Sequence, residues 1–395
     1  MSLPKLGFLT WSDWKGPTAF SGSPWSVRTA LERIGYEVVD IDVGTFHSSS
    51  RKIAHQHGSQ AMANPRFRAM ARKLLGPIVY GRLRTLQKAK AHSRTIDAAI
   101  QKAAPDVIVG VKMSRSIAYL QTDLPILYAT DATASMLNEG YKTTDWKGSG
   151  WKKANYELES RALQRADATV FWFTALVERA IQDHGADPSR LHVANTGSNV
   201  EPPEDHQHRP RSIPQRDDLR ILYVAADPMR KQISVAVDAV RTLRERGWNA
   251  RLFYMGPDHP QAEAPEVERV GVLRLDDEAD RATHQMLLNT SHVNLLPSRA
   301  DMTPVSVNEA SLFGLPSVVS SVGGLPDQVL DRTTGRVLPW DAPTSDWADA
   351  IEWVVESDER YGSLSTASHE HASSHFTWDA WAAKVSKIIQ NLVRR

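Results

Sequence analysis

The stretch "DMTPVSVNEASLFGLPSVVSSVGG", residues 301–324, holds a short helical segment followed by an apolar run. Thr303 is a favourable N-cap, and Pro304 fits the first helical position, where its missing N–H costs nothing. The predicted helix runs over 304–313 and ends at a glycine, a residue that readily adopts the left-handed conformation of a helix end. The segment "SVVSS" (317–321) then predicts a buried strand. This order is typical of a parallel α/β sheet.

Two carboxylates in this stretch suggest a binding site. Asp301 precedes the predicted helix, and Glu309 lies about one and a half turns inside it, at 3.6 residues per turn. A helix start at the carboxyl edge of a parallel sheet suits a phosphate, because it offers free N–H groups and a positive dipole end. Glu309 shares a face with Val305 and Leu312, where a carboxylate can accept two hydrogen bonds from a diol such as ribose. Spacing alone also allows an ordinary helix residue and a loop charge.

The segment upstream has the same rhythm. Arg230 and Lys231 stand at the start of a helix predicted near 230–246. Adjacent cations there oppose the helix dipole, so an anionic ligand would relieve the conflict; a solvated basic pair is the alternative. The strands predicted around this helix are "LRILYVAA" (219–226), "ARLFYMG" (250–256) and "HVNLLPS" (292–298).

The first half of the chain repeats the pattern. A helix over 23–35 begins with Ser23, a candidate cap, and Pro24, and the loop 12–24 before it contains Gly22. The tryptophans around this loop either pack or stack on a sugar or an apolar acceptor. The predicted strands are 5–11, 36–42, 106–112, 125–131 and 168–172, and the tryptophans are Trp11, Trp14 and Trp25.

These patterns predict an α/β fold with two doubly wound, Rossmann-like domains that face a central cleft. The chain of 395 residues is long enough for two domains. The Pro-rich, charged segment "EPPEDHQHRPRSIPQRDD" predicts a linker. The predicted boundaries are 1–200 for the first domain, 201–218 for the linker, 219–375 for the second domain and 376–395 for an amphipathic terminal helix that packs back on the first.

Composition narrows the function classes. There is no cysteine, which excludes disulfides, thiol catalysis and cysteine-based zinc sites. No run of 18 or more apolar residues and no secretory signal are present, so we expect a cytoplasmic protein. His55 and His57 could bind a metal, but a third ligand is not evident, and no metal is expected. The motifs of dinucleotide oxidoreductases, P-loop nucleotidases and α/β-hydrolases are missing.

Charge is unevenly distributed. Residues 43–96 contain no Asp or Glu but eleven Lys and Arg, which lie between residues 51 and 94 and are interleaved with apolar residues. A basic, partly amphipathic stretch can rest on an anionic membrane surface, which would place the chain at the inner face of the membrane. A solvated basic helical face is the alternative. No nucleic-acid partner is expected.

The second domain resembles the family 4 retaining glycosyltransferases of GT-B fold, the glycosyl transferases group 1. Their signature is an acidic pair with seven residues between, a helix of small residues, G-x-P, a strand and Gly-Gly. The segments 221–243, 267–277 and 156–201 also resemble family segments for the phosphates, the base and the crossover between the domains. The signature residues here are Asp301, Glu309, Ala310, Gly314, Pro316, Val318, Val319, Gly323 and Gly324.

The resemblance implies transfer of a hexose from a nucleotide diphosphate sugar, with retention, to a glycan, lipid-linked or small-molecule acceptor. Glu309 would hold the ribose diol, Arg230 and Lys231 would neutralise the leaving diphosphate, and Asp301 would contact sugar hydroxyls. Cations and a helix dipole would replace a metal. The implied catalytic residues are Asp131, Lys231 and Asp301, and the implied donor-binding residues are Arg230, Lys231, Asp301, Thr303, Val305, Ser306, Glu309, Gly22 and Gly197.

Three positions depart from the family pattern. Asp301 stands where glutamate is usual, Ala226 where arginine is usual, and Asp131 where a histidine often lies near the reaction centre. A non-catalytic paralogue that binds a sugar nucleotide and supports a partner enzyme therefore remains an alternative. A sugar phosphorylase or a sugar-nucleotide epimerase on the same fold is another.

Overall fold

The computed structural model describes residues 3–10, 22–43, 65–140, 148–202 and 211–394. It forms two compact units. The first comprises Met1–Ala194 and Ala382–Arg395, and the second comprises Asn195–Trp381. Each is built around its own parallel sheet, as predicted.

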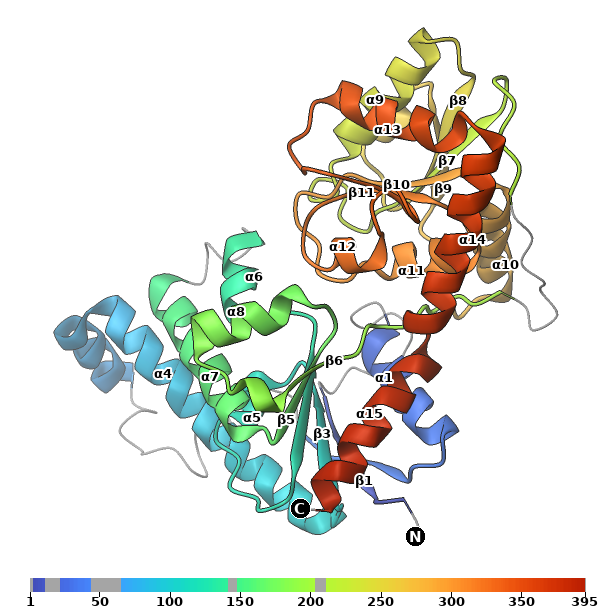
Figure 1. Cartoon of the computed structure of the whole chain (residues 1–395). Coiled ribbons are helices and arrows are strands. Elements are labelled where there is room, and N and C mark those ends of the chain that lie inside the picture. The colour runs from blue at the N-terminus through green and yellow to red at the C-terminus, as the bar shows by residue number, and fades with distance from the viewer. Residues whose placement is uncertain (1–2, 11–21, 44–64, 141–147, 203–210, 395) are drawn as a thin grey trace. The chain divides into compact units, whose positions relative to one another are not determined.

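The sheet of the first unit has six parallel strands in the order β2-β1-β3-β4-β5-β6 (Figure 1). The strands are β1 Leu6–Leu9, β2 Val38–Asp40, β3 Val107–Val111, β4 Ile126–Thr130, β5 Ala168–Phe171 and β6 Leu191–Val193. The helices are α1 Ser23–Arg33, α4 Pro65–Ala103, α5 Ser114–Ile117, α6 Ala134–Gly140, α7 Gly148–Arg165, α8 Ala175–His184 and the 3-10 helix η3 Pro188–Arg190.

The sheet of the second unit also has six parallel strands, in the order β12-β11-β10-β7-β8-β9. The strands are β7 Leu219–Val224, β8 Ala250–Met255, β9 Val267–Gly271, β10 Val293–Leu296, β11 Ser317–Ser320 and β12 Gly335–Leu338. The helices are α9 Ile233–Glu245, η4 Pro260–Glu263, α10 Glu278–Thr290, α11 Val305–Leu312, α12 Leu325–Gln328, α13 Thr344–Val355 and α14 Asp358–His375. The last helix, α15 Trp378–Val393, has its first residues in this unit and the rest in the first unit.

Every strand predicted from the sequence is present, with ends within two residues of the prediction. Three strands were missed: β6, β9 and β12. All three are edge strands, with the burial patterns of half-exposed segments. A strand buried on both faces has a continuous apolar run, whereas a short edge strand does not need one.

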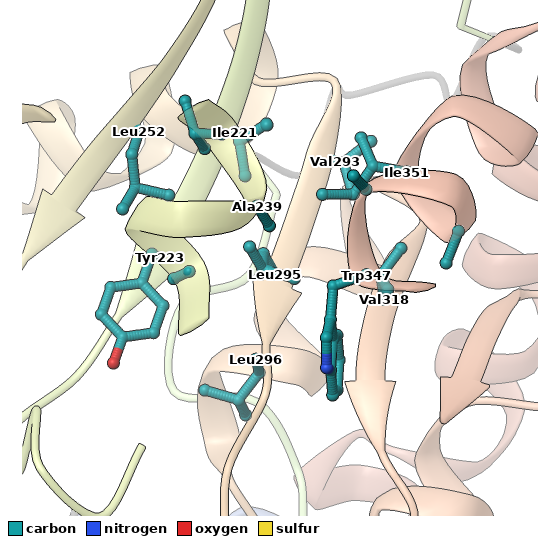
Figure 2. Close-up of a cluster of buried hydrophobic side chains, with 14 of the residues drawn as sticks. Ile221, Tyr223, Ala239, Leu252, Val293, Leu295, Leu296, Val318, Trp347 and Ile351 are labelled. Atoms are coloured by element: carbon teal, nitrogen blue, oxygen red, sulfur yellow. The ribbon is translucent and has the colours of Figure 1, made fainter. Parts of the chain in front are cut away.

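The core of the second unit lies between its sheet and helices α9 and α13 (Figure 2). Ile221 and Leu295 come from neighbouring central strands, and Ala239 approaches them from α9. Trp347 and Ile351 of α13 are fully buried beside β11. Burial of each such large side chain contributes about 1.5–3 kcal/mol, which keeps the central strand ends in fixed positions.

Two predicted helix caps differ from the structure. Gly22, with a left-handed φ of 76°, is the N-cap of α1, so Ser23 is the first helical residue and not the cap. Pro304 is the N-cap of α11, with a ψ of 110°, so the prediction of Thr303 as the cap was wrong by one residue. The reason is that the Pro304 carbonyl accepts from Val307 N at 3.1 Å and from a side chain of α12.

The predicted linker 201–218 differs in its second half. Residues 203–210 lie outside the described part of the chain, but residues 211–218 belong to the second unit. The guanidinium of Arg211 donates to the backbone carbonyls of Ser291 at 2.6 Å and Phe313 at 3.0 Å. These bonds fasten the chain beside β10 before β7 begins.

The terminal helix α15 crosses the division between the units. Its residues from Ala382 onward group with the first unit, where Tyr36 Oη lies 2.8 Å from Ser386 Oγ. Within the described ranges, none of the helices combines the length and the apolar character needed to cross a bilayer.

Candidate functional site

The candidate site of the second unit lies at the carboxyl ends of β7 and β10. These two strands are parallel neighbours, so the loops that follow them meet at one edge of the sheet. The loop after β7 carries Arg230 and Lys231, and the loop after β10 carries Asp301. Both cations precede α9, which begins at Ile233 and not at 230 as predicted.

A buried charge cluster joins the two loops. The Asp301 Oδ2 atom lies 3.1 Å from Arg230 Nη1 and 3.5 Å from Lys231 Nζ. Lys231 and Asp301 each expose only 8% of their surface. Lys231 Nζ also donates to the carbonyl of Val224 at 3.2 Å, and Arg230 Nε lies 3.5 Å from Asp227 Oδ2. Burying ions is costly unless they are paired, so the cluster indicates that these cations serve more than solubility.

Left-handed backbone at Gln232 separates the cations from the helix. Its φ is 56°, which is uncommon for a residue with a side chain. The turn over residues 228–232 ends at Gln232, and α9 begins at the next residue. Strained backbone of this kind persists where the surrounding structure fixes it and is frequent at binding sites.

Glu309 is buried in the middle of α11, with 4% of its surface exposed. Burial raises the pKa of Glu309 to about 7, and the charge of Lys231 and a hydrogen bond from the Asn199 backbone oppose the rise. His284 Nε2 lies 3.7 Å from Glu309 Oε2, but burial lowers the pKa of His284 to about 4. The imidazole is therefore neutral at pH 7, and the two groups are not an ion pair.

An amide network fixes α11 and was not predicted. Asn308 Nδ2 donates to the carbonyl of Thr196 at 2.9 Å. Gln328 Nε2 donates to Asn308 Oδ1 at 2.6 Å and to the Pro304 carbonyl at 3.0 Å. The residues are far apart in sequence, so no local spacing indicated the network. It holds the start of α11 and the backbone beside Glu309 in one arrangement.

The backbone at Gly197 lies beside the start of α15. A Cβ atom at this position would be 2.3 Å from the backbone nitrogen of Trp378, so a larger residue does not fit. Ser198 N donates to the Phe376 carbonyl at 3.0 Å. Close packing therefore explains the glycine, and its contact with a donor remains a prediction.

The predicted phosphate site is the first turn of α11. Val305 and Ser306 are its first two residues, where a helix has no internal acceptor for the backbone N–H groups. Thr303 is half-buried just before the turn. Arg230, Lys231, Asp301, Glu309 and this turn all belong to the second unit.

Gly323 lies against the loop that carries Asp301. Its φ is 54°, and a Cβ atom would be 1.8 Å from the Asp301 carbonyl oxygen. Gly324 N donates to the Met302 carbonyl at 2.6 Å. The Gly-Gly pair at the end of the opening stretch thus sets the position of the acidic loop.

We expect Gly323→Ala to displace the Asp301 loop and to lower the thermal unfolding midpoint. Gly247→Ala is a matched control, because Gly247 has a φ of 91° but no atom within 4 Å of the point where its new methyl group would lie. Left-handed strain alone costs about 1–2 kcal/mol in both variants. Calorimetry should show a clearly larger loss for Gly323→Ala, and equal losses would contradict the steric role.

Two predicted residues lie in the first unit. Asp131 follows β4, and its Oδ2 atom accepts from Lys112 Nζ at 2.8 Å. Lys112, at the end of β3, has a left-handed φ of 55°, and its Nζ atom lies 4.7 Å from the centre of the Trp172 ring. Sequence reasoning missed Lys112, although it follows a buried strand directly. Gly22 lies at the start of α1.

Some predicted features lie outside the described residues, namely Trp11, Trp14, His55 and His57. Trp25 is described and is 45% exposed. Among the residues that the structure describes, no group of three or more His, Asp or Glu is arranged to hold a metal ion.

Comparison with known proteins gives a family match within the second unit. Residues 218–357 match the family model of the glycosyl transferases group 1. The chain is 24% identical over 302 residues to the D-inositol 3-phosphate glycosyltransferase of Corynebacterium glutamicum. The aligned region covers 71% of each protein. It is 26% identical over 285 residues to the enzyme of that name from Corynebacterium aurimucosum, which covers 67% of this chain and 66% of that protein.

Solved structures are similar over almost the whole chain. Sucrose-phosphate synthase from Thermosynechococcus elongatus superposes with a TM-score of 0.69 at 15% identity, over 99% of each chain. Anabaena HepE in complex with UDP and glucose has a TM-score of 0.62 at 14% identity, over 98% of this chain and 100% of that one. At these identities the likeness establishes the fold. Within the second unit, residues 218–357 match the glycosyl transferases group 1, and the chain has the two-domain GT-B fold.

Proposed function

We propose that the chain transfers a hexose from a nucleotide diphosphate sugar to an acceptor hydroxyl, with retention of the anomeric configuration. The buried cluster of Arg230, Lys231 and Asp301 beside the start of α11 is the observation that supports this most directly. It pairs two cations with Asp301, on the loop that leads into the first turn of α11, and cations together with free helix N–H groups suit a diphosphate.

In this proposal, the diphosphate competes with Asp301 for the two cations. The bond between the sugar C1 and the diphosphate breaks, and a bond from C1 to the acceptor oxygen forms on the same face. The acceptor proton leaves with the diphosphate. Arg230, Lys231 and the amides of Val305 and Ser306 stabilise the negative charge that develops. Released from its cations, the Asp301 carboxylate can accept hydrogen bonds from sugar hydroxyls.

Glu309 is assigned to the ribose diol. Burial of the Glu309 carboxylate is unfavourable in the free protein and is only partly offset by the charge of Lys231, and two hydroxyl donors would stabilise it on binding. Asp131 and Gly22 of the first unit are proposed to contact the sugar and the donor. Thr303 and Gly197 complete the proposed donor-binding residues.

The acceptor class is open to a glycan, a lipid-linked molecule or a small molecule. The relatives are named for D-inositol 3-phosphate, a small phosphorylated polyol, which makes an acceptor of that class the first to test. An anionic membrane surface is also a proposed partner of the basic segment 51–94. We propose that no metal is required, because the cations and the helix supply the positive charge.

The test is donor turnover. The chain is incubated with a panel of uridine, guanosine and adenosine diphosphate sugars, with and without phosphorylated polyols, and release of the nucleoside diphosphate is followed. One donor should support slow release alone and faster release with an acceptor, and proton NMR should show the anomeric configuration of the donor in the product. A metal chelator should leave the rate unchanged.

Each other outcome overturns part of the proposal. Donor binding without release would identify a non-catalytic paralogue. A requirement for inorganic phosphate would indicate a phosphorylase, and an altered sugar on the same nucleotide would indicate an epimerase. An inverted product would contradict retention.

A further inference from the structure

Helix α4 (Pro65–Ala103; Figure 1) carries exposed apolar side chains in its first half. Six large apolar side chains within residues 70–83 are each more than two-fifths exposed, and Leu74 is 76% exposed. Single exposed apolar residues are common on soluble proteins, but a group of this size along one helix marks an interaction site. The six, which we call the α4 apolar surface, are Met70, Leu74, Leu75, Ile78, Val79 and Leu83.

A bend divides this surface. Gly76 has a non-helical φ of 74° and ψ of 157°, and Pro77 follows it. Proline cannot donate the backbone hydrogen bond that a continuous helix needs, so the two arms meet at an angle. The exposed apolar side chains lie on both sides of the bend.

The second arm is firmly attached to α7 (Gly148–Arg165). Arg82 Nε donates to Glu157 Oε2 at 3.0 Å, and Tyr80 and Ala89 are buried. A Cβ atom at Gly150 of α7 would be 2.2 Å from the Ile78 carbonyl oxygen, so the two backbones pack in contact. The second arm of the apolar surface therefore belongs to a helix that is packed against α7.

Cations accompany the apolar surface. Arg72, Lys73, Arg84 and Lys88 are exposed on the same helix. Partial burial and the charge of Arg84 lower the pKa of Lys88, as expected for neighbouring like charges four residues apart. No acidic residue occurs between residues 43 and 96, although Glu157 of α7 reaches Arg82. A partner that binds here must offer an apolar environment to these side chains and negative charge to the cations.

We propose that the α4 apolar surface and its cations dock on an anionic lipid bilayer, with the helix lying in the interface. The apolar side chains would enter the acyl boundary while the cations meet lipid phosphates, the arrangement by which interfacial helices bind. Each cation near such a surface strengthens binding about fivefold. This inference is independent of the donor chemistry of the second unit.

The experiment is sedimentation with vesicles of phosphatidylcholine alone or with about 30% phosphatidylglycerol. The full chain should bind the anionic vesicles at least tenfold better than the neutral ones. Leu74→Ser/Ile78→Ser should weaken anionic binding at least tenfold, and Arg84→Gln/Lys88→Gln about 25-fold, from two cations. Added salt should weaken binding of the chain to anionic vesicles, and little binding should remain at high salt concentration.

A matched control changes two exposed apolar residues of the second unit, Val272→Ser/Met286→Ser, and should leave vesicle binding unchanged. Circular dichroism should show that each variant is folded, because the substituted residues are exposed. Absence of binding to anionic vesicles, or equal binding by the two α4 variants and the unaltered chain, overturns the proposal. So does an equal loss in the second-unit control.

Discussion

Glu309→Gln should weaken donor binding strongly while it stabilises the free protein at pH 8. The carboxylate is proposed to accept two hydrogen bonds from the ribose diol, and an amide has one acceptor oxygen and two unwanted donor hydrogens. Truncation of one side of a buried charged hydrogen-bond set costs about 2–5 kcal/mol, or roughly 30- to 5,000-fold in affinity. Calorimetric titration with the donor identified by the turnover screen measures the loss.

The stability change has the opposite sign. Burial raises the pKa of Glu309 from 4.5 to about 7, so the folded state binds its proton more tightly than the unfolded state does. Stability is therefore fully retained below pH 4.5 and falls as the pH rises toward 7, by up to about 3 kcal/mol. Glutamine is neutral at every pH, so its variant should lose this dependence and unfold at a higher temperature at pH 8.

Glu159 provides a matched control. It is also buried, burial raises its pKa to about 7, and it accepts a hydrogen bond from Tyr128 Oη at 3.0 Å in the first unit. Glu159→Gln should flatten the pH dependence of stability in the same direction but leave donor affinity intact. If Glu309→Gln also left donor affinity intact, its burial would be a structural feature and the ribose assignment would be wrong.

The same pKa predicts how donor binding depends on pH. The ionised carboxylate accepts at both oxygens and makes the stronger, charge-assisted hydrogen bonds, whereas the protonated acid has a donor O–H at one of them, so donor affinity should rise between about pH 6 and 8 in the unaltered chain. Because the donor binds the ionised form of Glu309, the complex should carry fewer protons than the free protein near pH 7. The proton released on binding should be measurable by calorimetry in two buffers of different ionisation enthalpy.

The sequence predicted central strands where they are buried on both faces and form continuous apolar runs, as at residues 107–111. It also placed α11 within one residue, because proline restricts the backbone so strongly. The edge strands β6, β9 and β12 gave no comparable signal, because hydrogen bonding to the neighbouring strand, and not an apolar run of their own, defines them.

The site was predictable only where chemistry depends on local sequence. The loops after β7 and β10 could be expected to meet, and the structure brings Arg230, Lys231 and Asp301 together. Lys112 and the amide network of Asn308 and Gln328 were missed, because a pairing across elements leaves no spacing pattern in one sequence. The pKa of Glu309 likewise depends on burial that only the packed structure defines.

Lys231→Met should reduce turnover by about 10²- to 10³-fold, with a smaller effect on donor affinity, because the diphosphate gains negative charge as it leaves. Methionine keeps most of the buried volume of the lysine side chain but removes its charge. It also removes the charge that opposes the rise in the pKa of Glu309, so the pH midpoint for donor binding should move upward. Single-turnover kinetics separate the chemical step from binding.

Lys231 also balances Asp301, and the double variant Asp301→Asn/Lys231→Met separates the two roles. In Lys231→Met the buried Asp301 keeps only Arg230 of its two cations. The double variant removes this imbalance, and Arg230 stays beside Asp227, so thermal stability lost in Lys231→Met should be partly regained. Turnover of the double variant should stay well below that of the single variant Asp301→Asn if Lys231 neutralises the leaving diphosphate. Recovery of turnover together with stability would show that the lysine serves only to hold the aspartate, and the cation in contact with the leaving group would then be Arg230 alone.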